Sequence, residues 1–259
     1  KSYTVKIYKD GSEIKSVYAS GNKAIIDGLD ENAEYSVAVF GGNSHSETRI
    51  FRTGEYLGKV INYLHPSDGR YDFGGRFLGS QSIVRFKGDL YVSMDVFRGD
   101  NDRGAFNLTL LYRSRDDGKN WEFAAELVPL FWGELFVAGG RLCILGCSTE
   151  FGSLTVSASD DGENWDDPVF LMYGAGHGFA GPHKSPCARC VVDGKIWFSL
   201  EFGSHKSPIR FDCLSACVDE DKVMNASAWT FSEKTRVEYE WGGGYDSRFA
   251  IEGNTVERN

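Results

Sequence analysis

The feature that most constrains the fold is an internal repeat in the last two hundred or so residues. Three segments share one pattern, in which two apolar strand-like runs are joined by a turn that contains glycine: Lys87–Asp95, Gly139–Cys147 and Asp193–Glu201. Their turn glycines are Gly88, Gly140 and Gly194, which are 52 and 54 residues apart. A period of about 50 residues with several short strands in each repeat is typical of a β-propeller, in which each repeat is one four-stranded blade.

Each repeat also carries a third strand, a polar turn and a tryptophan. The tryptophans are Trp121, Trp165 and Trp229. Helical periodicity is almost absent, so the sequence predicts an all-β protein. In two of the turns the residues Ser114–Trp121 follow the pattern SxDxGxxW, and Ala158–Trp165 follow it except at Ala158. Asp can bond the turn amides, Gly can adopt positive φ, and Trp can fill the gap between strands, so this motif closes a hairpin without a catalytic role.

This motif is the Asp box, and it resembles the sialidase-like (BNR-repeat) β-propellers. Residues 76–258 are also similar in several segments to sialidase-like glycosidases of polysaccharide-degrading bacteria, for example Phe131–Phe136 and His183–Pro186. The resemblance implies a propeller of five or six blades. The sequence supplies about three blades and one strand at 249–257, so we expect an incomplete propeller, in a fragment that is inactive by itself.

The first 55 residues have a different pattern. Residues 3–8 and 13–18 predict a hairpin, and further strands are expected at 23–27, 34–40 and 46–52. Tyr35 stands six residues after Leu29, a spacing that suits a tyrosine corner, in which the phenol bonds a backbone group upstream. This part resembles a fibronectin type III domain with its first strands missing. We therefore predict a partial fibronectin type III-like β-sandwich at 1–55 and a partial sialidase-like propeller at 56–259.

The repeat also predicts where acidic groups meet. The seventh residue after each turn glycine is Asp95, Cys147 or Glu201. Because equivalent positions of radially repeated blades lie on one ring, Asp95 and Glu201 should project toward the same end of the central channel. Glycoside hydrolysis commonly uses such a pair, with one carboxyl group protonated and the other ionised. The alternative is that both are ordinary solvated residues at strand ends.

Five other residues complete the candidate site. Glu252 interrupts an apolar run, which favours a third catalytic carboxylate or a structural salt bridge. His183 could bond a sugar hydroxyl or assist proton transfer, unless it is only a surface histidine. Trp132 could stack on a sugar ring or belong to the core. We also expect Arg76 and Asn254 to bind substrate.

One departure from the sialidase pattern concerns the substrate. Sialidases clasp the carboxylate of sialic acid with three arginines, and the first belongs to the first strand of the propeller. The corresponding residues here, Leu78–Ile83, contain no arginine. Since a guanidinium is the natural partner of a carboxylate, sialic acid is not the expected substrate.

Composition narrows the partners. The formal charge of −9 and the pI near 5.1 give no reason to bind a phosphate backbone, so we expect no nucleic-acid partner. No apolar stretch approaches the roughly 20 residues that span a bilayer, so no membrane partner is expected. Six cysteines in strand-like runs are expected to pack as small apolar groups, with disulfides as the alternative. We expect no cofactor and no metal ion.

Two hypotheses of function follow. The first is a glycoside hydrolase that acts on glycans through Asp95, Glu201 and Glu252. The second is a non-catalytic propeller that binds carbohydrate or protein at its channel mouth. The pairing of the two modules predicts a secreted, periplasmic or cell-surface protein, and open blade edges could pair two copies of the chain.

Overall fold

Antiparallel strands make up nearly all of the regular structure, which confirms the all-β prediction. The chain divides into two units, Lys1–Val60 and Ile61–Asn259. No helix among the described residues is long and apolar enough to cross a membrane. The structure is a computed structural model, and it describes residues 2–21, 23–54, 76–98, 107–176, 179–204, 210–236, 238–242 and 252–256.

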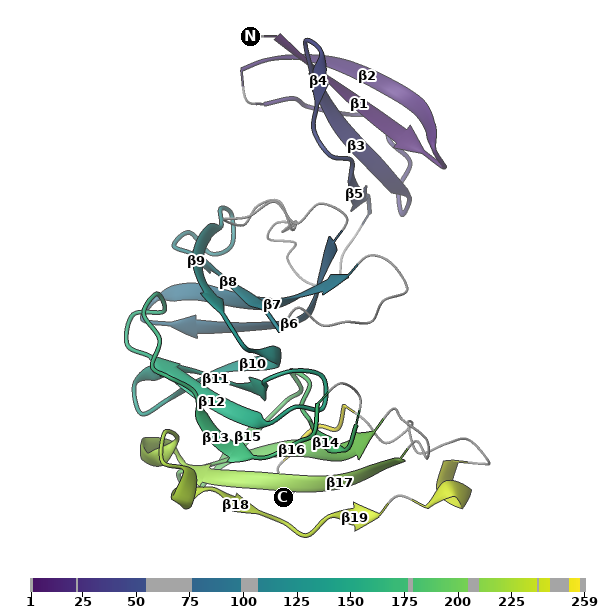
Figure 1. The fold of residues 1–259 in the computed structure, drawn as a ribbon. Helices are drawn as coiled ribbons and strands as arrows, with labels where there is room; N and C mark the ends of the chain where they lie inside the picture. The colour runs from purple at the N-terminus through teal and green to yellow at the C-terminus, as the bar shows by residue number, and fades with distance from the viewer. Residues whose placement is uncertain are drawn as a thin grey trace. The chain divides into compact units, whose positions relative to one another are not determined.

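The first unit contains one sheet in its described residues. Its strands are β1 (Ser2–Lys9), β2 (Ser12–Ser20), β3 (Glu34–Gly41), β4 (Ser44–His45) and β5 (Arg49–Arg52). β1 lies between β2 and β3, and both β4 and β5 pair with β3 (Figure 1). The predicted hairpin of β1 and β2 is confirmed, and its turn has positive φ at Asp10 and Gly11.

Tyr35 makes the bond that its spacing predicts, because its hydroxyl accepts the backbone N–H of Asp30 at 2.8 Å. The predicted strand at 23–27 is wrong, since these residues pair with no other strand. Ala24 and Ile26 still pack against the core of the sheet. The apolar alternation therefore buries side chains without forming a ladder. The fibronectin type III assignment stays a prediction.

The described residues of the second unit form three successive sheets. The first consists of β6 (Arg76–Phe86), β7 (Asp89–Arg98), β8 (Thr109–Ser114) and β9 (Glu122–Leu127), paired in that order. The second consists of β10 (Phe131–Ala138), β11 (Arg141–Cys147), β12 (Leu154–Ser159) and β13 (Val169–Met172), again in order. Each is an antiparallel meander of four strands, as the repeat predicts (Figure 1).

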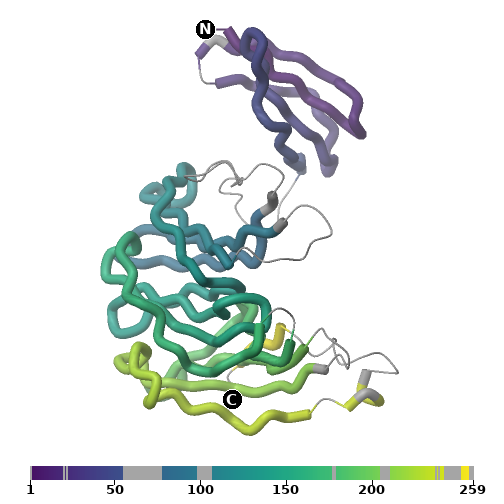
Figure 2. Tube along the Cα trace, viewed as in Figure 1, coloured from purple at the N-terminus to yellow at the C-terminus, as the bar shows by residue number. Residues whose placement is uncertain are grey.

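The third sheet has the same plan with both outer positions divided. β14 (Gly181–His183) and β15 (Cys190–Val192) pair with β16 (Lys195–Ser204), and β16 pairs with β17 (Arg210–Asp219). β18 (Thr230–Phe231) and β19 (Thr235–Arg236) then pair with β17. Three short 3-10 helices occur at Glu220–Lys222, Ala226–Ala228 and Tyr239–Gly242. In Figure 2 the third sheet runs from green to yellow.

Apolar side chains join the sheets in succession. One core cluster combines Leu111 of the first sheet with Leu135 and Ile144 of the second. Another combines Phe136 of the second sheet with Phe198 of the third, and their rings meet at 5.2 Å. The three turn glycines lie between the first two strands of their sheets, as predicted, with φ of 93°, 76° and 72°.

The turn at Ser114–Trp121 has the geometry that its sequence pattern predicts. Ser114 Oγ accepts the N–H of Gly118 at 2.8 Å, and Asp116 Oδ1 accepts the N–H of Asn120 at 2.9 Å. Gly118 has a φ of 82°, and Trp121 packs against the core of the first sheet. These contacts close the hairpin between β8 and β9.

The second turn is one residue shorter than the sequence match implies. Ser159, rather than Ala158, accepts the glycine N–H, from Gly162 at 2.8 Å. Asp161, rather than Asp160, accepts the N–H of Asn164 at 2.7 Å. Asp160 instead pairs with an arginine of β11. The match assigned the motif serine and aspartate one residue too early because consecutive Asp residues make both alignments possible.

None of the six cysteines, all of which lie in the described residues, forms a disulfide. Cys143, Cys147 and Cys217 are buried, as expected for small apolar groups, whereas the other three are partly exposed. The prediction of a strand at 249–257 is wrong for its described residues, because 252–256 adopt no strand. This segment lies against the third sheet, where Thr255 N–H bonds the carbonyl of Ala188 at 3.0 Å.

Candidate active site

The inner strand of each sheet, meaning the one that precedes the turn glycine, is interrupted. The interruption lies opposite the seventh residue after that glycine. Asp95 is paired with Gly79 and Cys147 with Phe131, and the ladder shifts its register immediately afterwards. Glu201 is paired with His183, the last residue of β14, and the inner strand resumes only at Cys190. A bulge lets one strand turn its backbone groups toward a neighbour. The repeat thus builds the same irregularity into all three sheets.

Asp95 is fully buried at the end of β7. Its carboxyl group accepts the hydroxyl of Thr109 at 2.6 Å and the backbone N–H of Trp132, from the next sheet, at 2.7 Å. Burial raises the pKa of Asp95 to about 7, although the hydrogen bonds from Thr109, Trp132 and Ser80 act in the opposite direction. Asp95 therefore holds its proton into the neutral range.

Glu201 is 3% exposed and accepts hydrogen bonds at both oxygens. Oε2 lies 2.8 Å from Nδ1 of His183, which is itself 4% exposed, and Oε1 accepts the N–H of Gly253 at 3.1 Å. Two hydrogen bonds of this kind suit a carboxylate, which has only acceptors to offer. His183 and Gly253 therefore fix the orientation of Glu201.

Trp132 connects the two carboxyl groups. Its backbone N–H donates to Asp95, and its φ is 58°. Its ring contacts the His183 ring edge-on, with 4.2 Å between the ring centroids. The chain of contacts runs from Asp95 through Trp132 and His183 to Glu201. The structure thus brings together four predicted site residues from three sheets.

Cys147 lies within reach of both carboxyl groups. Burial raises the pKa of its thiol to about 12, and the charges of Asp95 and Glu201 both raise it further. The backbone N–H and the charge of Lys184 act in the opposite direction. A thiol in this state is a poor nucleophile, so Cys147 is not a candidate catalytic group.

Sequence reasoning missed a buried ion cluster beside the site. Glu134 of β10, 2% exposed, pairs with Lys184 at 2.7 Å and with Arg189 at 2.9 Å. Lys184 is 1% exposed and follows His183 directly. The cluster ties the loop between β14 and β15 to the second sheet. A charged residue within the apolar run Phe131–Ala138 was the signal that could have revealed it.

Glu252 and Asn254 do not join the group as expected. Glu252 is exposed, with a φ of 62°, so the prediction of a carboxylate within an inner strand is wrong. Its neighbour Gly253 contacts Glu201 instead. Asn254 Oδ1 accepts the N–H of Ala188 at 2.8 Å, which is a structural role. Arg76 begins β6, but its side chain lies outside the described residues.

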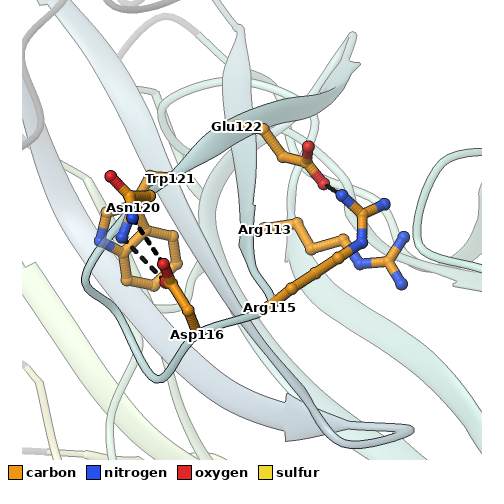
Figure 3. A pocket seen from close by; sticks show the side chains of 6 residues that line it. All are labelled: Arg113, Arg115, Asp116, Asn120, Trp121 and Glu122. Carbon is orange, nitrogen blue, oxygen red and sulfur yellow. Dashed lines mark hydrogen bonds and ion pairs between the residues drawn. The ribbon is translucent and has the colours of Figure 1, made fainter.

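Three cavities lined by described residues lie away from this group. Figure 3 shows one of about 160 Å³ around Trp121. Its charged side chains bond one another: Arg115 pairs with Glu122, and Asp116 accepts from Asn120. Among the described residues, no cluster of three or more His, Cys, Asp or Glu side chains could hold a metal ion.

No protein-family model matches the chain, and no curated protein matches it. An exo-β-1,3-galactanase from Clostridium thermocellum has a similar structure, with a TM-score of 0.50 and 14% identity over 80% of this chain and 47% of that one. An α-L-arabinanase from Penicillium chrysogenum gives a TM-score of 0.44 and 15% identity over 78% and 63%. An α-L-arabinofuranosidase from Fusarium graminearum gives 0.43 and 13% over 89% and 65%.

These comparisons concern the fold. The chain spans about half to two thirds of the length of those three structures. The galactanase match shows that the all-β arrangement of successive sheets is shared with a glycoside hydrolase of the β-propeller type. Fold alone does not carry function, which has to be argued from the site.

Proposed function

We propose that this chain belongs to a glycoside hydrolase that acts on glycans through Asp95 and Glu201. The observation that carries the proposal is a pair of buried carboxyl groups from two sheets, linked through Trp132 and His183. Asp95 and Glu201 each accept hydrogen bonds at both oxygens, and burial raises the pKa of Asp95 to about 7. A carboxyl group that keeps its proton near neutral pH can serve as the acid of a glycosidase, beside a second carboxyl group that acts as base or nucleophile.

In this mechanism Asp95 is the acid. It donates its proton to the glycosidic oxygen as the bond to the leaving sugar breaks. Glu201 stabilises the developing positive charge on the sugar. It then either takes a proton from the water that attacks the anomeric carbon, or attacks that carbon itself to form a glycosyl intermediate that water hydrolyses. His183 orients Glu201 by hydrogen bonding, and Trp132 offers a ring between the two groups.

The finer features of the proposal come from the sequence resemblance. They are a sialidase-like, Asp-box propeller of about three blades, and a partial fibronectin type III-like module before it. The absence of the first sialidase arginine argues against sialic acid as substrate. Since the structurally similar enzymes are named for arabinan- and galactan-type substrates, those polymers are the first to test.

The experiment measures the release of reducing ends from arabinan and β-1,3-galactan by the protein that carries this chain. Asp95→Asn and Glu201→Gln should each lower the rate by about 100-fold or more, because each removes a proton-transfer group. The matched controls are Asp193→Asn and Glu233→Gln, which change exposed residues. Full activity of both site variants would refute the proposal.

One observation favours a second candidate, a non-catalytic propeller that binds carbohydrate or protein. Asp95 and Glu201 are 0% and 3% exposed, so their carboxyl groups offer little surface to a substrate. Under this alternative the group from Asp95 to Glu201 is a structural network that joins three sheets. Binding of a polysaccharide without any release of reducing ends, in a protein whose site variants are only less stable, would favour it.

Location and assembly are also proposals. The pairing of a fibronectin-like module with a propeller supports a secreted, periplasmic or cell-surface protein. Unpaired strand edges support pairing of two copies, since such edges are templates for further strands. A sedimentation coefficient that does not change with protein concentration would reject self-association.

A further inference from the structure

A second cavity, of about 200 Å³, lies between the first and second sheets. One side is formed by the end of β9 and the residues that follow it, Glu126–Leu130. The other side is formed by Thr155 and Ser157 of β12 and by the loop Trp165–Pro168 before β13. Because one water occupies about 30 Å³, the cavity has room for several waters or for a small ligand that fills the same space as those waters.

The lining combines a ring with polar groups. Trp165 belongs to the second Asp-box turn, where its Nε1 donates to the carbonyl of Gly162 at 3.3 Å. Hydroxyl groups come from Thr155 and Ser157, and carboxylates come from Glu126, Asp166 and Asp167. Binding sites for small polar molecules typically show this combination of apolar surface and a few polar groups.

Two exposed aromatic side chains extend this surface. Phe170 of β13 is 48% exposed, and Tyr173, just after the strand, is 81% exposed. Their rings stack at 6.1 Å with planes 12° apart. Large aromatic groups usually contribute to cores or interfaces, so a stacked pair left in solvent is a flat platform that a ligand could cover.

The strand register places this platform on the side of the cavity. Phe170 is directly paired with Thr155, which lines the cavity. Side chains of directly paired antiparallel residues project from the same face, about 5 Å apart. The ring of Phe170 therefore stands on the cavity's face of the sheet, and Tyr173 continues the same surface outward.

We propose that Phe170, Tyr173 and the Trp165 cavity form a binding surface for neutral glycans, separate from Asp95 and Glu201. The C–H face of a sugar ring is apolar and packs on a flat aromatic ring. Its hydroxyl groups can donate to the carboxylates and bond the hydroxyl side chains of the cavity. Asp166 pairs with Arg141 at 2.8 Å, so the repulsion of anionic polymers comes from the carboxylate of Asp167 and the chain's formal charge of −9, which favours neutral ones.

The test is affinity electrophoresis of the purified chain through gels that contain arabinan, galactan or xyloglucan, with polygalacturonate as the anionic comparison. At least one neutral polymer should retard the chain. Tyr173→Ala and Phe170→Ala should each weaken that retardation about tenfold in dissociation constant. Tyr18→Ala, which removes a tyrosine that is 84% exposed in the first unit, is the matched control and should have no effect.

Three outcomes would overturn the proposal: no retardation by any of the neutral polymers, equal retardation of the wild type and Tyr173→Ala, or stronger retardation by polygalacturonate. Circular dichroism of each variant distinguishes lost binding from lost folding. The measurement needs no catalytic turnover, so its failure would leave the hydrolytic proposal for Asp95 and Glu201 untouched, and the reverse also holds.

Discussion

Replacing Asp95 by asparagine should remove a pH-dependent loss of stability. Burial raises the pKa of this carboxyl group from 3.8 to about 7. Between those two values the folded chain keeps a proton that the unfolded chain has released, so the free energy of unfolding falls as the pH rises. The interval between pH 5 and the folded pKa is about two pH units. At about 1.36 kcal/mol per unit, the free energy of unfolding falls by about 3 kcal/mol over this interval.

The assay is urea unfolding, followed by tryptophan fluorescence, at pH 5 and pH 8. The wild type should lose about 3 kcal/mol more than Asp95→Asn between these values. Asparagine places an amide where Trp132 N–H donates, but this cost does not depend on pH, so the comparison of slopes remains valid. Asp193→Asn, at an exposed turn, should keep the wild-type slope. Identical slopes for the wild type and Asp95→Asn would refute the reasoning.

Three further predictions concern stability. Lys184→Met should lower the free energy of unfolding by about 3 kcal/mol, because it leaves the buried carboxylate of Glu134 without one partner. Lys222→Met, at an exposed ion pair, should lower it by less than about 1 kcal/mol. Equal losses in the two variants would contradict this prediction. Gly162→Ala should lower the melting temperature more than Gly88→Ala. Both glycines have positive φ, but only at Gly162 would a Cβ meet the buried ring of Tyr91. Equal shifts of the melting temperature would be evidence against the packing of Tyr91 on this turn. The side chain and backbone N–H of Asn120 lower the pKa of Asp116 to about 2. The stabilisation by the Asp116 carboxylate is therefore present above the unfolded pKa and is lost as the pH falls toward 2. Asp116→Asn should flatten the acid side of the profile of stability against pH, and an unchanged profile would exclude this role.

The repeat was enough to predict much of the second unit. A glycine turn every 50 or so residues located the first two strands of each sheet, because a hairpin needs positive φ at that place. Counting seven residues onward from Gly88 and Gly194 then located Asp95 and Glu201. Equivalent positions in repeated sheets face the same way, so sequence spacing alone could predict that these two residues occupy equivalent places in the first and third sheets.

Other features could not be read from spacing. The interruption of each inner strand depends on backbone bonds to the next sheet, such as Trp132 N–H to Asp95, which no local pattern reveals. The pairing of Glu134 with Lys184 joins residues 50 positions apart. Residues 23–27 alternate like a strand, but their backbone joins no sheet, and alternation reports burial rather than strand pairing.

The account depends most on the convergence of three sheets at Asp95, Trp132, His183 and Glu201. The most direct measurement is an NMR pH titration of the chain with labelled tryptophan and histidine. The amide of Trp132, which donates to Asp95, should titrate with a midpoint of about 7, and its indole should show a nuclear Overhauser effect to the ring of His183. A midpoint near 4 with no effect between the two rings would contradict the account.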